Sequence, residues 1–376
     1  MSSTTLVQLA PSLARGGRSR AVLDTVQAVV SAGGRAIVVS SGGPMLPDLL
    51  RLHAEHFLLP NGGNPVWARL TLTARLANVL RETPVDLIQA RSPRLAWIAQ
   101  ALARRLRAKW IATLHDPLTF AGAMTRFVER RQAHADALVA VSEHVAREVR
   151  RLLPAAADRV EAIPPGINLD RFDPAIVRAD RLMRLAAELR IPDGAHVILC
   201  PTTFAEDRGQ KLLIEAVGRL GRDDVFCLLL GSLGDTAPFE REIERTIERA
   251  GLQGRVQIGP FVEDMPAAYM LADVVVAPGG SRLGGSRPLI EAQAMGRPVV
   301  AEEGGGAAEC MRPGVTGWLA GEGDSAAMAS ALDRALSLDA DRRAELARAA
   351  QEHVRAGYGL AQSNRRLLEL FGRLIA

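Results

Sequence analysis

The amino-acid sequence predicts an α/β protein with two doubly wound domains, and three observations support this prediction. The chain has 376 residues, of which 48% are hydrophobic, so it is too long for one ordinary domain and can bury two cores. Short apolar runs alternate with longer amphipathic stretches, as βαβ units require. A Pro-Pro-Gly segment at 164–166 divides these runs into two series.

The apolar runs are interpreted as strands of two parallel sheets, because helical patterns separate nearly all of them. The predicted strands of the first series are 5–10, 35–40, 56–60, 85–90, 109–114 and 137–142. Those of the second series are 196–201, 225–231, 255–259, 273–278, 297–301 and 316–320.

The domain boundaries follow from this order. A period of 3.6 residues predicts an amphipathic helix over 360–375, with no strand after it. We place residues 1–165 and the C-terminal helix 358–376 in the first domain, and residues 166–357 in the second. Doubly wound sheets bind ligands at the carboxyl ends of their strands, so the expected site is a cleft between the domains.

The cysteines and the N-terminus indicate a cytoplasmic location. Cys200, Cys227 and Cys310 are too few and scattered for a disulfide framework, and they show no metal-ligand spacing. The start of the chain has no basic leader before an apolar core, and no run of about eighteen apolar residues occurs. We therefore expect neither export by a signal peptide nor a membrane span.

The charge is unevenly distributed. Residues 1–165 hold 21 Lys and Arg against 12 Asp and Glu, although the net charge of the whole chain is only +4. Arginines at 104–107 and 147–151 alternate with apolar residues at helical spacing, which fits either solvated helix faces or a surface that rests on anionic lipid or receives an acidic acceptor. Aromatic residues form only 4% of the chain and no binding motif is present, so nucleic acid is not an expected partner.

A pair of glycines, Gly16 and Gly17, lies between the first predicted strand and the helix after it. Glycines there let backbone N–H groups approach an anion at the positive end of a helix. A tight turn without a ligand explains the same pair.

The segment SRPLIEAQAMGRPVV predicts a loop, a helix that begins near Pro288 and ends before Gly296, and a buried strand. The N–H groups over Arg287, Leu289 and Ile290 are expected to be unpaired and able to hold a diphosphate, since Pro288 has none. Glu291 would repel phosphate there, so we assign it to ribose hydroxyls one turn along. The alternative is a surface glutamate favoured by the helix dipole.

Three further side chains are candidates at loops of the two sheets. Arg208 and Lys211 stand at the start of a predicted helix, where they either pair with phosphate oxygens or are plain surface charge. His115 ends a predicted strand and either faces a cleft or is satisfied by the backbone. The remaining histidines share no ligand spacing, so no metal site is expected.

Taken in order, these segments resemble the retaining family 4 glycosyltransferases of the GT-B fold, especially those of lipopolysaccharide or capsule synthesis. The resemblance covers most of the chain and rests on order and spacing more than on any one motif. The segments that carry it are PSLARGG, DLIQARSPRLAW, TLHDP, AVSEH, IPPGINLDRFDP, GQKLLIEA, GPFVEDMPAAYMLADVVVAP and PLIEAQAMGRPVVAEEGGGAAE with PGVTGWL.

The resemblance implies two Rossmann-like domains, one for the acceptor and one for the donor, on either side of a cleft. It also implies transfer of a sugar from a nucleotide-sugar donor to a glycan or lipid-linked acceptor, with no cofactor or required metal, in the cytoplasm or at the inner face of the membrane. The site residues that it implies are His115 and Glu291 as catalytic residues, with Gly16, Gly17, Arg208, Lys211, Pro260, Phe261, Ser286, Arg287, Pro288, Leu289 and Ile290 around the donor.

The sequence departs from the family pattern at the donor site. The family's paired glutamates, E-x7-E, are here Leu283 and Glu291, so the first carboxylate is absent. Ser286 stands where the family has glycine, and Thr203 where it has a phosphate-binding arginine. Preorganised charge is usually the largest contribution to catalysis. Two hypotheses follow: an active transferase with an altered donor site, or a GT-B protein that binds nucleotide or glycan, or partners an active transferase, without turnover.

Overall fold

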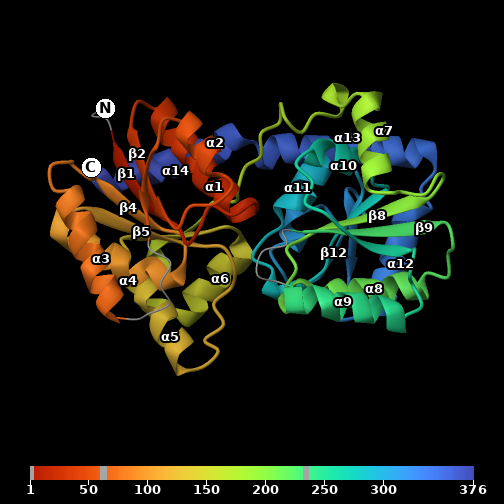
Figure 1. The fold of residues 1–376 in the computed structure, drawn as a ribbon, viewed down its shortest axis with the longest axis horizontal. Coiled ribbons are helices and arrows are strands. Elements are labelled where there is room, and N and C mark those ends of the chain that lie inside the picture. Colours follow the sequence, from red (N-terminus) through yellow and green to blue (C-terminus); the bar gives the residue numbers. More distant parts are fainter. Residues whose placement is uncertain (1–3, 60–65, 232–236) are drawn as a thin grey trace. The chain divides into compact units, whose positions relative to one another are not determined.

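The computed structural model describes residues 4–59, 66–231 and 237–376 of the chain (Figure 1). The chain divides into two compact units: unit 1 contains residues 1–165 and 361–376, and unit 2 contains residues 166–360. Each unit has one parallel sheet covered by helices on both faces. The prediction of two doubly wound α/β domains is confirmed.

The sheet of unit 1 has the strand order β3-β2-β1-β4-β5-β6-β7, with every pair parallel. The direction in which the strands are added reverses between β1 and β4, so the loops after these two strands diverge. The strands are β1 (Thr5–Leu9), β2 (Arg35–Ser40), β3 (Glu55–Leu58), β4 (Leu87–Ala90), β5 (Lys109–Leu114), β6 (Ala137–Ala140) and β7 (Val160–Ala162). The helices are α1 (Gly17–Ser31), α2 (Leu46–Arg51), α3 (Val66–Val79), α4 (Ala96–Leu106), α5 (Ala123–Arg130), α6 (Glu143–Leu152) and α14 (Leu360–Ile375).

The sheet of unit 2 has the order β10-β9-β8-β11-β12-β13 and is also parallel throughout. Its reversal falls between β8 and β11. The strands are β8 (His196–Pro201), β9 (Val225–Leu230), β10 (Val256–Gly259), β11 (Val274–Ala277), β12 (Val299–Glu302) and β13 (Gly317–Ala320). The helices are α7 (Ala179–Glu188), α8 (Gln210–Arg219), α9 (Ala237–Arg249), α10 (Met265–Leu271), α11 (Arg287–Ala294), α12 (Ser325–Leu336) and α13 (Ala340–Gly357).

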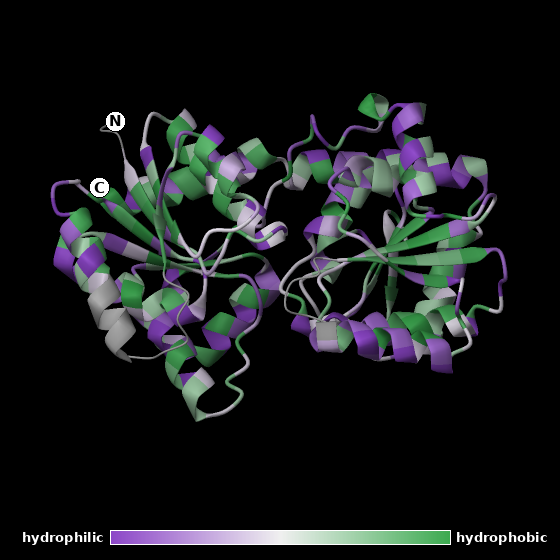
Figure 2. Cartoon of the chain, viewed as in Figure 1, coloured by the Kyte–Doolittle hydropathy of each residue, from purple (hydrophilic) through white to green (hydrophobic). Residues whose placement is uncertain are grey.

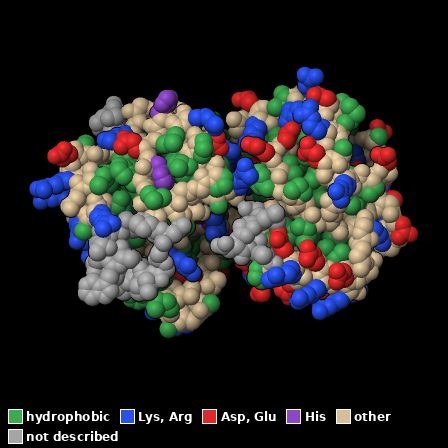
Figure 3. Space-filling model, viewed as in Figure 1, with side chains coloured by type: hydrophobic (Ala, Val, Ile, Leu, Met, Phe, Trp, Pro, Cys, Tyr) green, Lys and Arg blue, Asp and Glu red, His purple; other side chains and the backbone are tan. Residues whose placement is uncertain are grey.

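The hydropathy of the chain explains these layers. The strands of both sheets are almost continuously apolar, whereas the outer helices alternate apolar and polar residues (Figure 2). A strand that is buried on both faces is expected to be apolar throughout, and a covering helix needs only one apolar face. On the face of unit 2 seen in Figure 3, cations and carboxylates are interspersed over the outer surface.

Two details of the fold differ from the sequence prediction. The strand expected over 56–60 runs from Glu55 to Leu58, and residue 60 lies outside the described residues. The short strand β7 was not predicted, because three residues with Glu161 in the middle carry too little periodicity to distinguish a strand from a loop.

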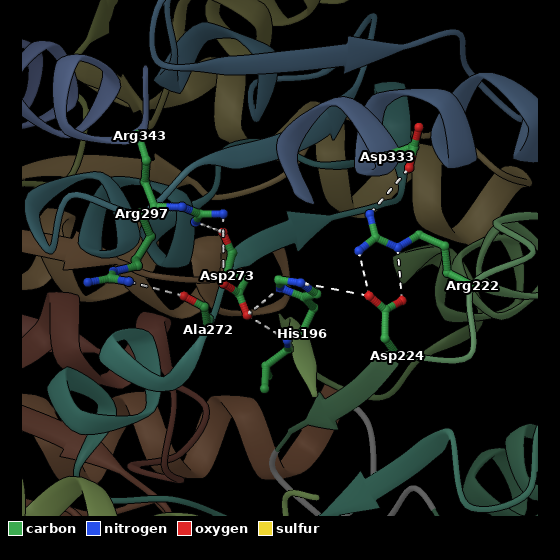
Figure 4. Close-up of polar contacts among 9 residues, drawn as sticks. His196, Arg222, Asp224, Ala272, Asp273, Arg297, Asp333 and Arg343 are labelled. Carbon is green, nitrogen blue, oxygen red and sulfur yellow. Dashed lines mark hydrogen bonds and ion pairs between the residues drawn. The ribbon is translucent and has the colours of Figure 1, made fainter. Parts of the chain in front are cut away.

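A network of ion pairs joins the starts of three strands in unit 2 (Figure 4). His196 lies between the carboxylates of Asp224 and Asp273, at 3.8 and 3.6 Å, and Arg222 pairs with Asp224 at 2.7 Å. These residues lie at the amino edge of the sheet, opposite the edge where the strand-end loops gather. The network therefore joins strand starts and lies away from the candidate site.

No helix within the described ranges is long and apolar enough to cross a membrane. The last helix, α14, packs against unit 1. Its side chains Leu367, Leu370 and Phe371 are buried in the core cluster that contains β1 and α1 side chains. The Arg366 guanidinium also donates a hydrogen bond to the carbonyl of Ala162, at 2.6 Å. The chain thus returns to its first unit after completing the second.

We predict that Phe371→Ala lowers the free energy of unfolding of unit 1 by about 3–5 kcal/mol, because it leaves a cavity beneath α14. Urea denaturation followed by circular dichroism measures this. Ile375→Ala on the same helix is the matched control, since Ile375 is exposed and its truncation leaves no cavity. Equal losses in the two variants would contradict the packing of α14 described above.

Candidate active site

The loops that follow β8 and β11 meet at the point where the strand order of unit 2 reverses. A Cβ atom on Gly209 would lie 2.7 Å from the backbone nitrogen of Gly279, so the two loops approach as closely as glycine permits. Gly209 adopts a φ of 74° and immediately precedes α8. Open α/β sheets bind ligands outside the carboxyl ends of their strands at such a reversal, which makes this edge the candidate donor site.

Helix α11 begins at the same edge. Ser286 caps it, because its hydroxyl accepts a hydrogen bond from the N–H of Leu289 at 3.3 Å. The Ile290 N–H bonds to the carbonyl of Ser286, also at 3.3 Å. The expectation that the N–H groups of Leu289 and Ile290 are unpaired is therefore wrong. The serine that replaces the family's glycine at 286 supplies the first of these partners itself.

Glu291 lies one turn into α11 and is 9% exposed. Its carboxylate accepts one hydrogen bond from the Tyr269 hydroxyl and forms one ion pair with Arg287, both at 2.9 Å. Tyr269 is fully buried, and burial together with the neighbouring carboxylate raises the pKa of its hydroxyl well above the usual value. The hydroxyl therefore stays a hydrogen-bond donor and orients Glu291. Tyr269 gave no signal in the sequence beyond being an aromatic residue in an apolar helix.

The other predicted donor-site residues lie on neighbouring loops. Arg208 pairs with Asp207 at 3.4 Å in the turn before α8. The Lys211 ammonium pairs with Glu242 of α9 at 2.6 Å and lies 5.7 Å from the ring centre of Phe239, so it is turned toward α9 in this structure. Pro260 and Phe261 follow the edge strand β10 and are exposed. Each of these four residues lies on a loop at the carboxyl edge of the sheet of unit 2, or on a helix that follows such a loop.

The loop between β11 and α11 is held by hydrogen bonds to two carboxylates that the sequence analysis did not identify. The buried Glu302, at the end of β12, accepts hydrogen bonds from the N–H groups of Gly279 and, at 2.7 Å, Gly323. Glu322 accepts a hydrogen bond from the N–H of Ser281 at 2.8 Å. Leu283, where the family has its first glutamate, is 4% exposed and packs into the core of unit 2. The loop therefore directs position 283 into the protein interior.

Unit 1 gathers its own candidates at the carboxyl edge of its sheet. Gly16 and Gly17 lie at the start of α1, and Gly16 adopts a φ of 144°. His115 follows β5, and its Nε2 atom is buried with no hydrogen-bond partner among the described residues. Burial, together with the nearby cations of Arg91 and Arg18, lowers the pKa of His115 to about 3. The imidazole is therefore neutral at physiological pH.

Arg91 is a buried cation that sequence reasoning missed. It directly follows β4, at the reversal of strand order in unit 1. Its guanidinium donates hydrogen bonds to the Gln8 side chain at 2.9 Å, the Thr25 hydroxyl at 2.5 Å and the carbonyl of Ala21 at 3.1 Å. Burial lowers its pKa to about 10, which still leaves it charged. A charged residue directly after a buried strand was the available signal.

Family comparisons match this arrangement over most of the chain. The model of "Glycosyltransferase Family 4" matches residues 15–171, and that of "Glycosyl transferases group 1" matches residues 195–338. The chain belongs to the family 4 glycosyltransferases.

Curated relatives of the chain include two D-inositol 3-phosphate glycosyltransferases. The one from Xylanimonas cellulosilytica is 33% identical over 249 residues, which cover 65% of this chain and 58% of the relative. The one from Salinispora tropica is 34% identical over 263 residues, covering 66% and 53%. The chain thus spans little more than half the length of these relatives.

Solved structures share the fold of this chain. A glycosyltransferase from Rickettsia africae superposes with a TM-score of 0.88 at 24% identity, covering 100% of this chain and 99% of that one. Anabaena HepE in complex with UDP and glucose gives 0.85 at 22% identity, covering 98% and 99%. Together with the two parallel sheets, these similarities show the GT-B fold.

We predict that Leu283→Glu, which restores the family's first glutamate, lowers the free energy of unfolding by about 3–5 kcal/mol, because it places an unpaired carboxylate in the core. Leu283→Met is the control and should cost less than about 1.5 kcal/mol, since it conserves volume and polarity. Urea denaturation of both variants at pH 7 measures the difference. A Glu variant as stable as the parent would show that position 283 reaches solvent.

We predict that His115 makes the protein less stable as the pH falls from about 6.5 toward 3. In this window the unfolded chain binds a proton at His115 and the folded chain does not, so acid favours unfolding. His115→Asn should flatten the dependence of the unfolding free energy on pH over this range, as measured by urea denaturation at a series of pH values. His53→Asn, at an exposed position, should leave it unchanged. Parallel curves for the parent and His115→Asn would contradict the burial of a neutral imidazole.

Proposed function

We propose that this chain transfers a sugar from a nucleotide-sugar donor to a hydroxyl group of an acceptor, with retention and without a required metal or cofactor. The observation that carries the proposal is the carboxyl edge of unit 2, where Glu291 lies on α11, the helix that follows β11, and is held by Tyr269 and Arg287. Among the described residues, no group of three or more His, Cys, Asp or Glu is placed to hold a metal ion.

The donor would bind through its nucleotide at this edge. Each oxygen of Glu291 has one protein partner, and a carboxylate has about four acceptor positions, so ribose hydroxyls can still bind to it. Arg208 and the positive end of α11 suit the diphosphate, whereas Lys211 would first have to leave Glu242. Pro260 and Phe261 would lie against the base. UDP in the HepE complex favours a uridine nucleotide.

The acceptor would bind at the carboxyl edge of unit 1, where Gly17 begins α1. Two cations lie near this edge, the buried Arg91 and Arg18, which pairs with the carboxylate of Asp116. They would suit an acceptor that carries phosphate. The acceptor is then a phosphorylated polyol, as the names of the relatives suggest, or a lipid-linked glycan of cell-surface polysaccharide synthesis. The second acceptor would place the protein at the inner face of the membrane.

In the reaction, the bond between the anomeric carbon and the diphosphate breaks, and a bond to the acceptor oxygen forms. The acceptor hydroxyl gives its proton to the departing diphosphate. His115, being neutral with a buried and unpartnered Nε2, would form a hydrogen bond with a hydroxyl of the donor sugar near the reacting carbon. Arg208, at the carboxyl edge of unit 2, would stabilise the charge that develops on the leaving group.

A second function, nucleotide binding without turnover, is favoured by the burial of Leu283. No carboxylate occupies the family's first position, and Thr203 contributes no cation there. Loss of each group would reduce transition-state stabilisation by about 2–4 kcal/mol, or one and a half to three orders of magnitude in rate.

We predict that calorimetric titration with UDP-, GDP- and ADP-linked sugars shows binding. Glu291→Gln should weaken the preferred donor about tenfold to a hundredfold, because a hydrogen bond to a charged group is worth about 1.5–3 kcal/mol. Glu244→Gln on the exposed face of α9 is the matched control. Thermal unfolding of both variants reports whether the change is confined to binding. Unaltered affinity in a folded Glu291→Gln variant would remove Glu291 from the donor site.

Turnover separates the two functions. Release of nucleoside diphosphate is followed with the preferred donor, in the presence of inositol 3-phosphate or a lipid-linked oligosaccharide. Release that depends on one acceptor supports transfer and identifies the acceptor class. Donor binding with no release from either acceptor supports the function without turnover.

A further inference from the structure

A stripe of polar side chains crosses the sheet of unit 1 on the face that α1 covers. Gln8 of β1 and Gln89 of β4 are paired in register, and the Gln89 amide donates a hydrogen bond to the Thr113 hydroxyl of β5 at 2.8 Å. Arg91 and His115 come two residues after Gln89 and Thr113, so they continue the same face. The rest of this face belongs to an apolar core cluster. The polar side chains thus gather toward the carboxyl edge of the sheet.

Arg91 connects this stripe to α1. Its Nε atom donates a hydrogen bond to the Gln8 side chain at 2.9 Å, and its Nη2 atom donates to the Thr25 hydroxyl and the Ala21 carbonyl, at 2.5 and 3.1 Å. The Gln8 amide in turn donates to the carbonyl of Val22 at 3.1 Å. Gln8, Thr25 and Arg91 are all buried. One guanidinium therefore joins β4 to both β1 and α1.

These contacts lie one turn after the glycine turn, which we define as Gly16 and Gly17. Gly16 has no side chain to cap α1, and a Cβ atom placed on it would meet no atom of the described residues within 4 Å. Packing around Gly16 therefore does not hold the glycine turn. The hydrogen bonds of Arg91 and Gln8 to the helix help to fix its position instead.

The charge of Arg91 also acts on His115. Burial is the main cause of the low pKa of His115, and the cations of Arg91 and Arg18 lower this pKa further. The carboxylate of Asp116, which pairs with Arg18, opposes them. Arg91 itself has a pKa of about 10, so it is charged at neutral pH. The glycine turn and the imidazole thus both depend on one buried cation.

The stability of unit 1 alone does not require an arginine at this position. Burying a guanidinium costs free energy that its hydrogen bonds must offset, and an apolar side chain among apolar neighbours avoids this cost. Arg91 stands where the strand order reverses between β1 and β4, which is where open α/β sheets bind their ligands. The cost and the position together favour a functional role.

We propose that Arg91 is a positioning residue for glycosyl transfer, which holds the glycine turn and His115 in place at the carboxyl edge of unit 1. The inference rests on the proposed function, in which the acceptor binds at this edge and His115 contacts the donor sugar. The Nε and Nη2 atoms of Arg91 are engaged by Gln8, Ala21 and Thr25, so Arg91 acts through these groups.

The test compares acceptor-dependent release of nucleoside diphosphate by the full chain and by Arg91→Met, which keeps an unbranched side chain but removes the charge and the donors. We expect kcat to fall about tenfold to a hundredfold, because a misplacement of about 1 Å costs up to about a hundredfold in rate. Donor affinity, measured by calorimetry, should be retained, since the nucleotide binds at unit 2. Arg104→Met, at an exposed position of α4, is the matched control and should have the kcat of the parent.

A second pair of variants keeps the test decisive if Arg91→Met does not fold. Thr25→Val removes the hydroxyl that accepts the hydrogen bond from Arg91, and Thr25→Ser keeps it. We expect Thr25→Val to lower kcat and Thr25→Ser to retain it. A purely structural role would instead lower the unfolding temperature of Thr25→Val and leave the kcat of the folded protein unchanged.

His115 gives a readout that does not depend on turnover. Its ring signal is followed by NMR as the pH is lowered and is assigned by comparison with His115→Asn. In Arg91→Met the pKa of His115 should rise, because one of the two nearby cations is lost, whereas in Arg104→Met it should not change.

The two readouts separate the failure of this inference from that of the proposed function. A parent chain that releases no nucleotide with any acceptor would overturn the proposed function, and the NMR signals of His115 and Gly17 would still decide whether Arg91 positions these groups. A folded Arg91→Met variant with the parent's kcat, or with unchanged signals of His115 and Gly17, would overturn the role of Arg91.

Discussion

The functional arrangement of this chain depends on one constraint: every paired strand in both sheets runs parallel to its neighbours. A parallel sheet needs a crossover after each strand, so every strand-end loop emerges at the same edge. Residues that are far apart in sequence, such as His115 and Gly17, thereby come to one edge of unit 1. Arg208 and Glu291 come to one edge of unit 2 in the same way. The opposite edge of unit 2 holds the ion-pair network around His196, which joins strand starts.

At the edge of unit 2, carboxylates mainly position other groups. Glu302 and Glu322 bind backbone N–H groups of the loop after β11, and Glu291 is itself held by Tyr269 and Arg287. A loop fixed at Gly279 and Ser281 has little freedom to turn Leu283 outward. The absence of the family's first glutamate is thus accommodated by packing that favours an apolar residue there.

The sequence predicted the fold well because periodicity is a local property. Each apolar run of the second series corresponds to an observed strand, and the amphipathic helix over 360–375 is α14. Pairing among side chains is not local, so the sequence did not predict which side chains contact one another. No pattern connects Tyr269 with Glu291 or Lys211 with Glu242, and Arg91 became visible as a buried cation only when β1, α1 and β4 were packed together. The capping of α11 likewise depends on one hydrogen bond, from the N–H of Leu289 to the hydroxyl of Ser286.

The charge of residues 1–165 is another property whose consequence depends on the packing of side chains. An excess of arginine over the first 165 residues fits solvated helices as well as a binding surface, because composition does not say which charges face outward. Around α5 the answer depends on Glu129. Were its carboxylate exposed, it would lie beside Arg126 and Arg130 and partly neutralise them; turned inward to the N–H groups of Thr119 and Phe120, it leaves them unopposed. A single buried hydrogen-bond acceptor therefore determines whether a basic helix presents a balanced or a cationic surface to its surroundings.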